Sequence, residues 1–194
     1  MTIVKMYITL LSAIVAGLAN SIFCKLNILS VLKKPIDNGK ILKDKKRIFG
    51  NNKTWKGLIG YIILNTIFSI IFGFIWKYTK LEYLNYFYIN HNNELLYNLL
   101  IGFLLGLFYA LFELPNSFIK RRLGIKEGKT TKDIYKVLFI FLDQADSIFG
   151  MALVVWMFYP LGIKLYLLFI LVGALTHILL NMLLYFLHIR KNMF

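Results

Sequence analysis

Cysteine, proline and acidic residues are scarce in this sequence. Its 194 residues include one cysteine, three prolines and nine aspartates or glutamates. The single cysteine, Cys24, excludes an intrachain disulfide, and without partner ligands it indicates no metal site. Only 16% of the residues are charged, whereas 59% are hydrophobic. A soluble domain of this length could not bury so many apolar side chains in its core.

The hydrophobic residues gather in five continuous runs. Each run has about 18–24 residues, enough for a helix to cross a hydrocarbon core of about 30 Å. The runs do not alternate with polar residues and are too few for a closed barrel, which argues against strands. The first run could be mistaken for a signal peptide, but no convincing A-x-A cleavage site follows, so we expect a retained helix. We therefore predict an all-α integral membrane protein, a single transmembrane domain over residues 1–194, with helices at about 6–23, 57–76, 95–114, 135–158 and 165–187 and basic loops at 24–56 and 115–134.

Basic residues are distributed unevenly between the two sides of the predicted bundle. Ten lie in the first basic loop, six in the second, one just after it (Lys136) and two in the C-terminal tail, against four on the other side. By the positive-inside tendency, we expect a cell-membrane protein with its N-terminus outside and both basic loops and the C-terminus in the cytoplasm. These side chains could be topology signals, contacts to anionic lipids, or a cationic vestibule for a phosphate-rich substrate. No recognisable nucleic-acid-binding fold accompanies the charge, so we expect no nucleic-acid partner.

Two aspartates lie within the fourth hydrophobic run. Asp143 and Asp146 are three residues apart, so a helix places both carboxylates on one face. Each costs about 2.5–3.5 kcal/mol on membrane-insertion scales, and the two anions repel unless a proton or a cation neutralises them. Glu113, at the end of the third run, is a third candidate. Because Mg²⁺ takes oxygen ligands and often combines one or two carboxylates with substrate phosphates, we predict a magnesium site.

Pro115 follows the third run and is predicted to end its helix. Asn116 and Ser117 would then cap a short helix over residues 118–123. Such a helix N-terminus favours an anion, and Lys120 and Arg121 follow within one turn. Carboxylates in the membrane facing cationic loops favour phosphoryl or nucleotidyl transfer.

The fifth run contains His177 and Asn181, which are four residues apart and share a helix face. A buried histidine usually satisfies a polar group of another helix, so both a structural and a direct role stay open for this pair.

Several motifs resemble those of one enzyme family, the CDP-archaeol synthases, which are themselves similar to the CDP-diacylglycerol synthases. The likeness covers nearly the whole chain, with the motifs in the same order. It rests on Asn116–Ile125 followed by Asp143–Ser147, on Pro35–Lys40 and Arg47–Gly57 in the first basic loop, on Ala19–Asn20, and on Thr176–His177 with Asn181.

The resemblance implies transfer of CMP from CTP to a lipid phosphate, giving a CDP-lipid and pyrophosphate. The lipid would be 2,3-bis-O-geranylgeranyl-glycerol phosphate or a phosphatidate-like molecule, and the cofactor would be Mg²⁺. The expected partners are CTP, the lipid phosphate and membrane lipids, and a homodimer is a further candidate. The implied catalytic residues are Asp143, Asp146, Lys120 and Arg121, with Glu113, Asp143 and Asp146 for metal and Asn51, Lys53, Thr54, Ser117, His177 and Asn181 for substrate.

The resemblance has two departures. Phe112–Glu113 stands where the family often has Gly-Asp, and no arginine lies between Asp143 and Asp146 as it does in many diacylglycerol enzymes. The second departure points to the archaeol-type branch. The alternative function is a small cation transporter that uses the Asp pair, which would leave Arg47–Gly57 unexplained. CDP-alcohol phosphotransferases and UbiA-like prenyltransferases need further aspartate motifs that this sequence lacks.

Overall fold

The computed structural model describes residues 1–129, 134 and 136–189. Three short elements, η1 (Ser30–Lys33), η2 (Glu82–Leu84) and α3 (Tyr86–Ile89), connect longer helices. The described residues form no strands, only isolated bridges. Among the described residues, five helices are long and apolar enough to span a membrane, which confirms the predicted all-α membrane class: α1 (Thr2–Lys25), α2 (Trp55–Thr79), α4 (Leu95–Arg122), α5 (Lys136–Phe158) and α6 (Gly162–Phe186). Tyr135, at the start of the fourth predicted helix, and the basic residues Lys132, Arg190 and Lys191 lie outside the described residues.

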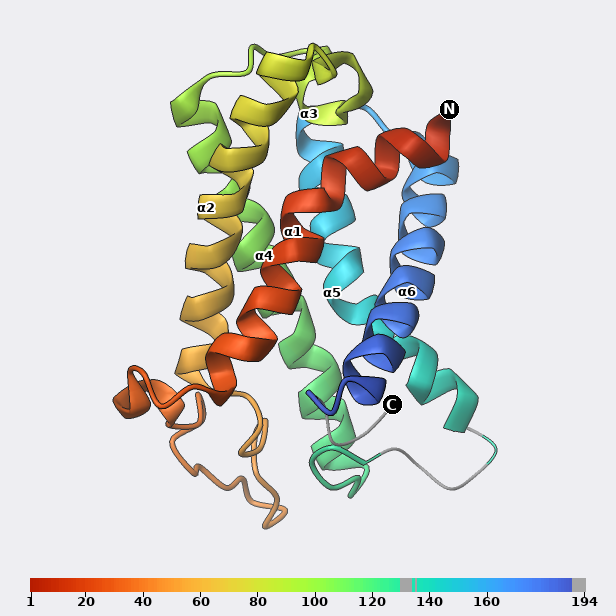
Figure 1. Cartoon of the computed structure of the whole chain (residues 1–194). Helices are drawn as coiled ribbons and strands as arrows, with labels where there is room; N and C mark the ends of the chain where they lie inside the picture. The colour runs from red at the N-terminus through yellow and green to blue at the C-terminus, as the bar shows by residue number, and fades with distance from the viewer. Residues whose placement is uncertain (130–133, 135, 190–194) are drawn as a thin grey trace.

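Helix α4 is the centre of the bundle (Figure 1). It packs against α2 on one side and α5 on the other, while α1 covers α2 and α6 covers α5. Gly102 and Gly106 permit the close approach of α4 to α2, because a Cβ at these positions would lie 2.6 Å from Thr66 Cα and 2.7 Å from Ile62 Cα. Such spacing of small residues is typical of helix contacts in membranes. The buried Asn65 adds a hydrogen bond of 2.9 Å to the Gly102 carbonyl.

The prediction that Pro115 ends its helix is wrong. Helix α4 continues through the proline to Arg122, so Asn116 and Ser117 are interior residues and no separate helix N-terminus exists for an anion. A proline inside a helix removes one N–H bond and costs about 3 kcal/mol in isolation. Here Asn116 and Lys120 bind carboxylates of α5, which holds the last turns of α4 in place. Membrane helices tolerate proline where neighbouring helices supply such contacts.

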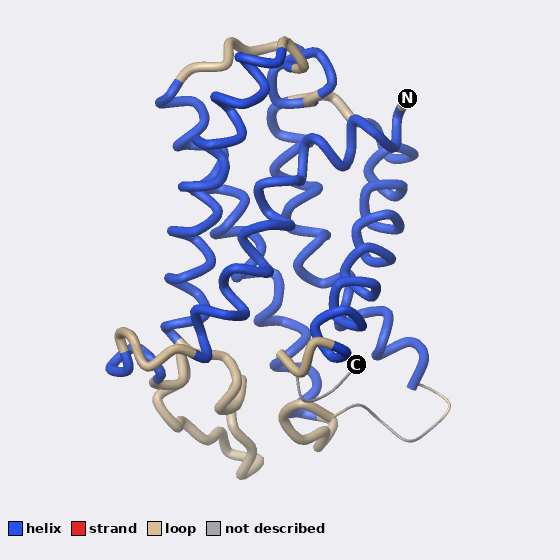
Figure 2. Tube along the Cα trace, viewed as in Figure 1, coloured by secondary structure: helices blue, strands red, loops and turns tan. Residues whose placement is uncertain are grey.

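Asp37 organises the first basic loop, which lies with the second at one end of the bundle (Figure 2). Its buried carboxylate accepts hydrogen bonds from the Arg47 guanidinium and from the backbone N–H groups of Gly39, Phe49 and Gly50. Burial alone would raise the pKa of Asp37, but Arg47 and these N–H groups outweigh it and hold the pKa well below its usual range. The loop is therefore built around one ionised carboxylate.

The two basic loops are also joined to each other. Arg122, at the end of α4, pairs with Asp44 at 2.7 Å and donates to the Arg47 carbonyl. Glu127 of the second loop also contacts the first loop, because its carboxylate accepts a hydrogen bond of 3.2 Å from the backbone N–H of Asn51. Gly50 has φ +104°, and an added Cβ there would lie 2.7 Å from the Glu127 side chain. The contact between the two loops therefore requires glycine at this position.

Replacing Asp37 with asparagine is expected to destabilise this loop by about 2–3 kcal/mol at neutral pH, because a buried acceptor would lose its charge-assisted bonds. Since the pKa of Asp37 is lowered by folding, its stabilisation is full above the unfolded pKa of about 3.9 and is lost as the pH falls through the folded pKa. The difference in stability between the wild type and Asp37→Asn should therefore become smaller in acid. Thermal unfolding in detergent at pH 7 and at about pH 2, well below the unfolded pKa, would measure it. Asp44→Asn is the matched control, because its carboxylate is 40% exposed, and an equal loss there would contradict the assignment.

Candidate active site

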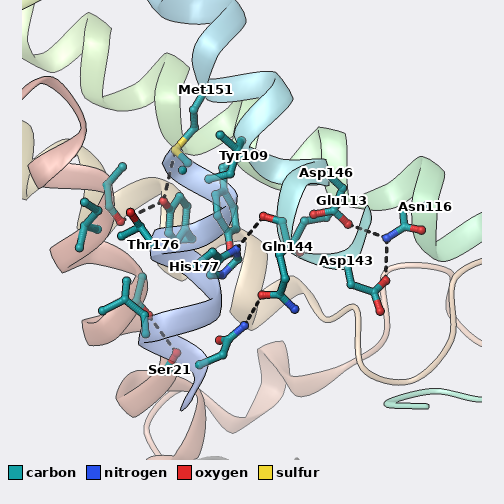
Figure 3. Close-up of a pocket in the computed structure, with 18 of the residues that line it drawn as sticks. Ser21, Tyr109, Glu113, Asn116, Asp143, Gln144, Asp146, Met151, Thr176 and His177 are labelled. Atoms are coloured by element: carbon teal, nitrogen blue, oxygen red, sulfur yellow. Dashed lines mark hydrogen bonds between the residues drawn. The ribbon is translucent and has the colours of Figure 1, made fainter. Parts of the chain in front are cut away.

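A cavity of about 570 Å³ lies inside the bundle and extends from residues of the first turns of α1 to the basic loops. Helices α1, α4, α5 and α6 supply most of its lining, and the first basic loop adds Asn52 and Lys53. One part of the lining is charged, with all three predicted carboxylates and the cations Lys53, Lys120 and Arg121. Figure 3 shows Glu113, Asn116, Asp143 and Asp146 turned toward one another in this part.

The Asp143 and Asp146 carboxylates share one donor, as their common helix face predicts. Asn116 Nδ2 donates to Asp143 Oδ1 at 2.8 Å and to Asp146 Oδ2 at 2.9 Å. The second oxygen of Asp143 pairs with Lys120 Nζ at 2.6 Å, and the second oxygen of Asp146 accepts from the Ser147 N–H. Asn116 and Lys120 lie four residues apart on α4, so one helix face holds both aspartates.

Glu113 has its own cation. Lys53 Nζ lies 2.6 Å from Glu113 Oε2, although the two residues are sixty positions apart in sequence. Burial would lower the pKa of Lys53, but the carboxylates of Glu113, Asp146 and Asp143 outweigh it and raise the pKa. Lys53 is therefore protonated at neutral pH and brings a positive charge to the acidic groups. Tyr109, one turn earlier on α4, also hydrogen-bonds to Glu113.

Arg121 completes the cationic part of the cavity. It is 7% exposed and contacts Glu127 across 3.6 Å, while its Nε has no hydrogen-bond partner within the described part of the chain. The neighbouring Ser117 is also buried and lines the same cavity. The arrangement can hold an anion of several charges against Lys53, Lys120 and Arg121.

The carboxylates fit magnesium better than they fit a metal held by protein alone. Within residues 1–129, 134 and 136–189, no three His, Cys, Asp or Glu side chains form a group that could hold a metal ion. Glu113, Asp143 and Asp146 supply only oxygen donors, and their present partners are Lys53, Lys120 and Asn116. Mg²⁺ suits such a set, because it commonly takes one or two carboxylates and completes its shell with water and phosphate oxygens.

The sequence model described as "CarS-like: CDP-archaeol synthase" matches residues 2–194 of this chain. The chain belongs to this family. Among its relatives, the CDP-archaeol synthase of Methanococcus aeolicus is 30% identical over 157 residues, which cover 80% of each chain. The one of Methanocaldococcus jannaschii is 27% identical over 156 residues, 80% of this chain and 81% of the relative. The match to the CDP-archaeol synthase of Methanocorpusculum labreanum, 39% identical over 94 residues, spans only about half the length of either chain, 48%.

A solved structure described as an intramembrane enzyme for archaeal membrane lipids biosynthesis has the same fold. It superposes with a TM-score of 0.61 over 91% of this chain and 92% of that chain, at 20% identity. The family resemblance of the motifs is thus confirmed by the family match, and the predicted helical membrane architecture by the fold.

Most of the residues that family membership suggested for substrate meet in the cavity. Besides the charged groups, Ser117, His177 and Asn181 line it. Two others lie beside it. Asn51 accepts a hydrogen bond of 2.8 Å from Arg47, and Thr54 caps α2 by accepting from the Gly57 N–H at 3.2 Å. Neither is among the residues that line the cavity, so their roles in substrate binding stay predictions.

Gln144 is a site residue of this family member that the sequence reasoning missed. Its side-chain oxygen accepts from Asn181 Nδ2 at 2.5 Å, and its backbone carbonyl lies 3.2 Å from His177 Nδ1, as Figure 3 shows. The His177–Asn181 face of α6 is therefore fixed to α5 beside the aspartates. The signal available in the sequence was a polar amide, Gln144, between Asp143 and Asp146 in a hydrophobic run.

Proposed function

We propose that this protein is a membrane cytidylyltransferase that transfers CMP from CTP to a lipid phosphate, producing a CDP-lipid and pyrophosphate. The observation that carries the proposal is the cavity in which Asp143 and Asp146 face Lys53, Lys120 and Arg121 within a CDP-archaeol synthase family member. The lipid substrate would be 2,3-bis-O-geranylgeranyl-glycerol phosphate, giving CDP-archaeol, or a phosphatidate-like lipid.

The proposed reaction needs positioning and charge neutralisation more than a strong base. A phosphomonoester has a second pKa of about 6, so the lipid phosphate is largely dianionic at neutral pH. One of its oxygens attacks the α-phosphorus of CTP, the new P–O bond forms, and the bond from the α-phosphorus to the bridging oxygen breaks as pyrophosphate leaves. Lys53, Lys120 and Arg121 neutralise the phosphate charges.

Bound Mg²⁺ would supply further charge neutralisation to the phosphates, and Asp143 and Asp146 are the residues that would hold it, with Glu113 a third candidate. In the structure, Glu113 and Asp143 each bind a lysine. Substrate phosphates would compete with these carboxylates for Lys53 and Lys120, which frees carboxylate oxygens as the lysines turn to the phosphates.

The orientation that we propose places the cavity's charged part at the cytoplasmic face, where CTP is available. The two basic loops and the end of α4 lie together at one end of the bundle, and the N-terminus lies at the other (Figure 1). The basic residues then obey the positive-inside tendency, with the N-terminus outside and the C-terminus in the cytoplasm. A homodimer stays a prediction.

The test is nucleotide transfer by the detergent-purified protein. With labelled CTP, Mg²⁺ and a panel of ether- and ester-linked lipid phosphates, we expect a labelled CDP-lipid that disappears when the metal is chelated. The preferred lipid in the panel identifies the substrate class. A folded protein that forms no product from any of them and does not bind CTP would contradict the proposal and favour the cation transporter.

A further inference from the structure

The helix bundle has an opening between α1 and α6. Four pairs of helices pack extensively: α1 with α2, α2 with α4, α4 with α5, and α5 with α6. In the described helices, α1 and α6 make no extensive contact with each other, so the ring of helices is not closed. Figure 1 shows α1 running obliquely across the bundle, with its first turns near the start of α6 and its end beside the start of α2. The two helices therefore diverge toward the end that carries the basic loops.

Two side-chain contacts span the opening. Tyr7 and Thr176 share a hydrogen bond of 3.0 Å between their hydroxyl groups. Because the Thr176 hydroxyl donates its hydrogen to the Val172 carbonyl at 2.8 Å, Tyr7 is the donor. Lys25, at the end of α1, donates to the His188 carbonyl at 3.3 Å. Each contact is a single exposed bond worth about 0.5–1.5 kcal/mol when isolated, far weaker than a packed helix interface.

The edges of the opening are also walls of the cavity. Ile14, Gly17 and Leu18 of α1 and Leu180 of α6 are half-buried, and all four line the cavity. They are apolar, in contrast to the charged part beside α4. Ser21 and Thr176, labelled in Figure 3, continue this edge and line the cavity too. One cavity thus joins the cations and carboxylates to an apolar slot at the lipid-facing surface.

The cavity is too small to contain both substrates. Pockets of about 300–1,000 Å³ hold one drug-sized ligand, and this cavity has about 570 Å³. Lipid chains long enough to cross one leaflet, about 15 Å of hydrocarbon, must therefore extend out of the cavity. The α2–α4 side offers no passage, because Gly102 and Gly106 bring these backbones into contact. The α5–α6 side is closed as well, since a Cβ at Gly173 would lie 2.5 Å from Ile148.

We propose that the slot between α1 and α6, between the Tyr7–Thr176 and Lys25–His188 contacts, is the passage through which the lipid substrate enters from the bilayer and in which its chains stay during transfer. The proposal rests on the proposed function, and it assigns the apolar half of the cavity to the chains and the charged half to the phosphate. Charge complementarity orients the lipid, since its phosphate meets Lys120 and Arg121 only with the chains directed to the slot.

The direct test is photolabelling with a lipid phosphate that carries a diazirine in mid-chain, which does not require turnover. We expect labelling that excess unlabelled lipid phosphate abolishes, on peptides containing residues 14–21 and 176–184. Competed labelling on the lipid-facing side of α2 or α4 instead, or no competed labelling in a protein that turns over the same lipid, would overturn the passage. A protein that is labelled in the slot yet makes no CDP-lipid would contradict the proposed function and leave the lipid site standing.

A second variant tests whether the slot admits long chains. A Cβ at Gly17 would meet only Tyr61 Cε2, at an ordinary 3.8 Å, so the backbone accepts a side chain there, and Gly17→Phe adds bulk to this wall of the cavity. We expect the ratio of kcat/KM for a long-chain lipid phosphate to that for a short-chain, water-soluble analogue to fall by at least about tenfold. Ile22→Phe is the matched control, because Ile22 is 49% exposed on α1 and is not a cavity residue. An unchanged ratio in Gly17→Phe, or an equal fall in Ile22→Phe, would overturn the passage.

Discussion

Replacing Asp146 with asparagine is expected to reduce CDP-lipid formation by at least about a hundredfold, because a neutral amide cannot hold a cation beside the transferred phosphorus. Asp143→Asn should have a similar effect and would also leave Lys120 without its carboxylate, 2.6 Å away. Both aspartates meet Asn116, so loss of either changes the position of the other. Turnover of a saturating lipid phosphate with CTP measures the effect on kcat.

The same variants separate a role in metal binding from a role in folding. Mn²⁺ binding followed by electron paramagnetic resonance should weaken in both variants, while their helical content stays close to wild type. Glu94→Gln is the control, because Glu94 is exposed at the start of α4, at the opposite end of the bundle. Full turnover in either aspartate variant, in folded protein, would refute the assignment of the carboxylates.

The Lys53–Glu113 pair should show opposite behaviour in stability and in activity. Lys53→Met leaves Glu113 without its cation at a site where both side chains are about one-fifth exposed, 20% and 23%. We expect each single replacement, Lys53→Met or Glu113→Gln, to cost about 1–3 kcal/mol, less than a fully buried pair because water still reaches both groups. The double variant should recover most of that loss, since neither charge is left unpaired.

Activity should not recover with stability. Without Lys53, one of the cations available to the nucleotide phosphates is absent, so the double variant should stay at least about a hundredfold below wild-type kcat/KM. Thermal unfolding in detergent and transfer assays on the four proteins of the cycle measure both quantities. Lys53→Arg keeps the charge and should retain more activity than Lys53→Met. Strictly additive stability losses, or normal turnover in Lys53→Met, would show that the pair does not act as described.

The membrane architecture and the acidic part of the site could be predicted from sequence because both depend on the free energy of placing single residues in the membrane, which short stretches of sequence reveal. Charges such as Asp143 and Asp146 are expensive inside a hydrophobic run, so their presence alone indicates a function. Helix periodicity then placed both carboxylates on one face, where the structure finds them bound to Asn116.

The parts that depended on contacts between distant segments could not be predicted in the same way. The proline rule predicted an end at Pro115, and it failed because Asn116 and Lys120 are held by α5. The pairing of Lys53 with Glu113 joins a loop to a helix sixty residues away, and no local pattern indicates it. Gln144 was overlooked for a related reason, since its partners lie on α6.

The side chains that α4 contributes follow a single stripe along its surface. Tyr109, Glu113, Asn116 and Lys120 are spaced by four, three and four residues, so they recur once per turn on the face toward α5 and the first basic loop. Adding or removing one residue within this stretch would rotate everything beyond it by about 100° about the helix axis. A change of chain length within this stretch would therefore turn the groups beyond it away from the site, whereas the connector over residues 80–94 lies at the far end of the bundle, away from every group of the site.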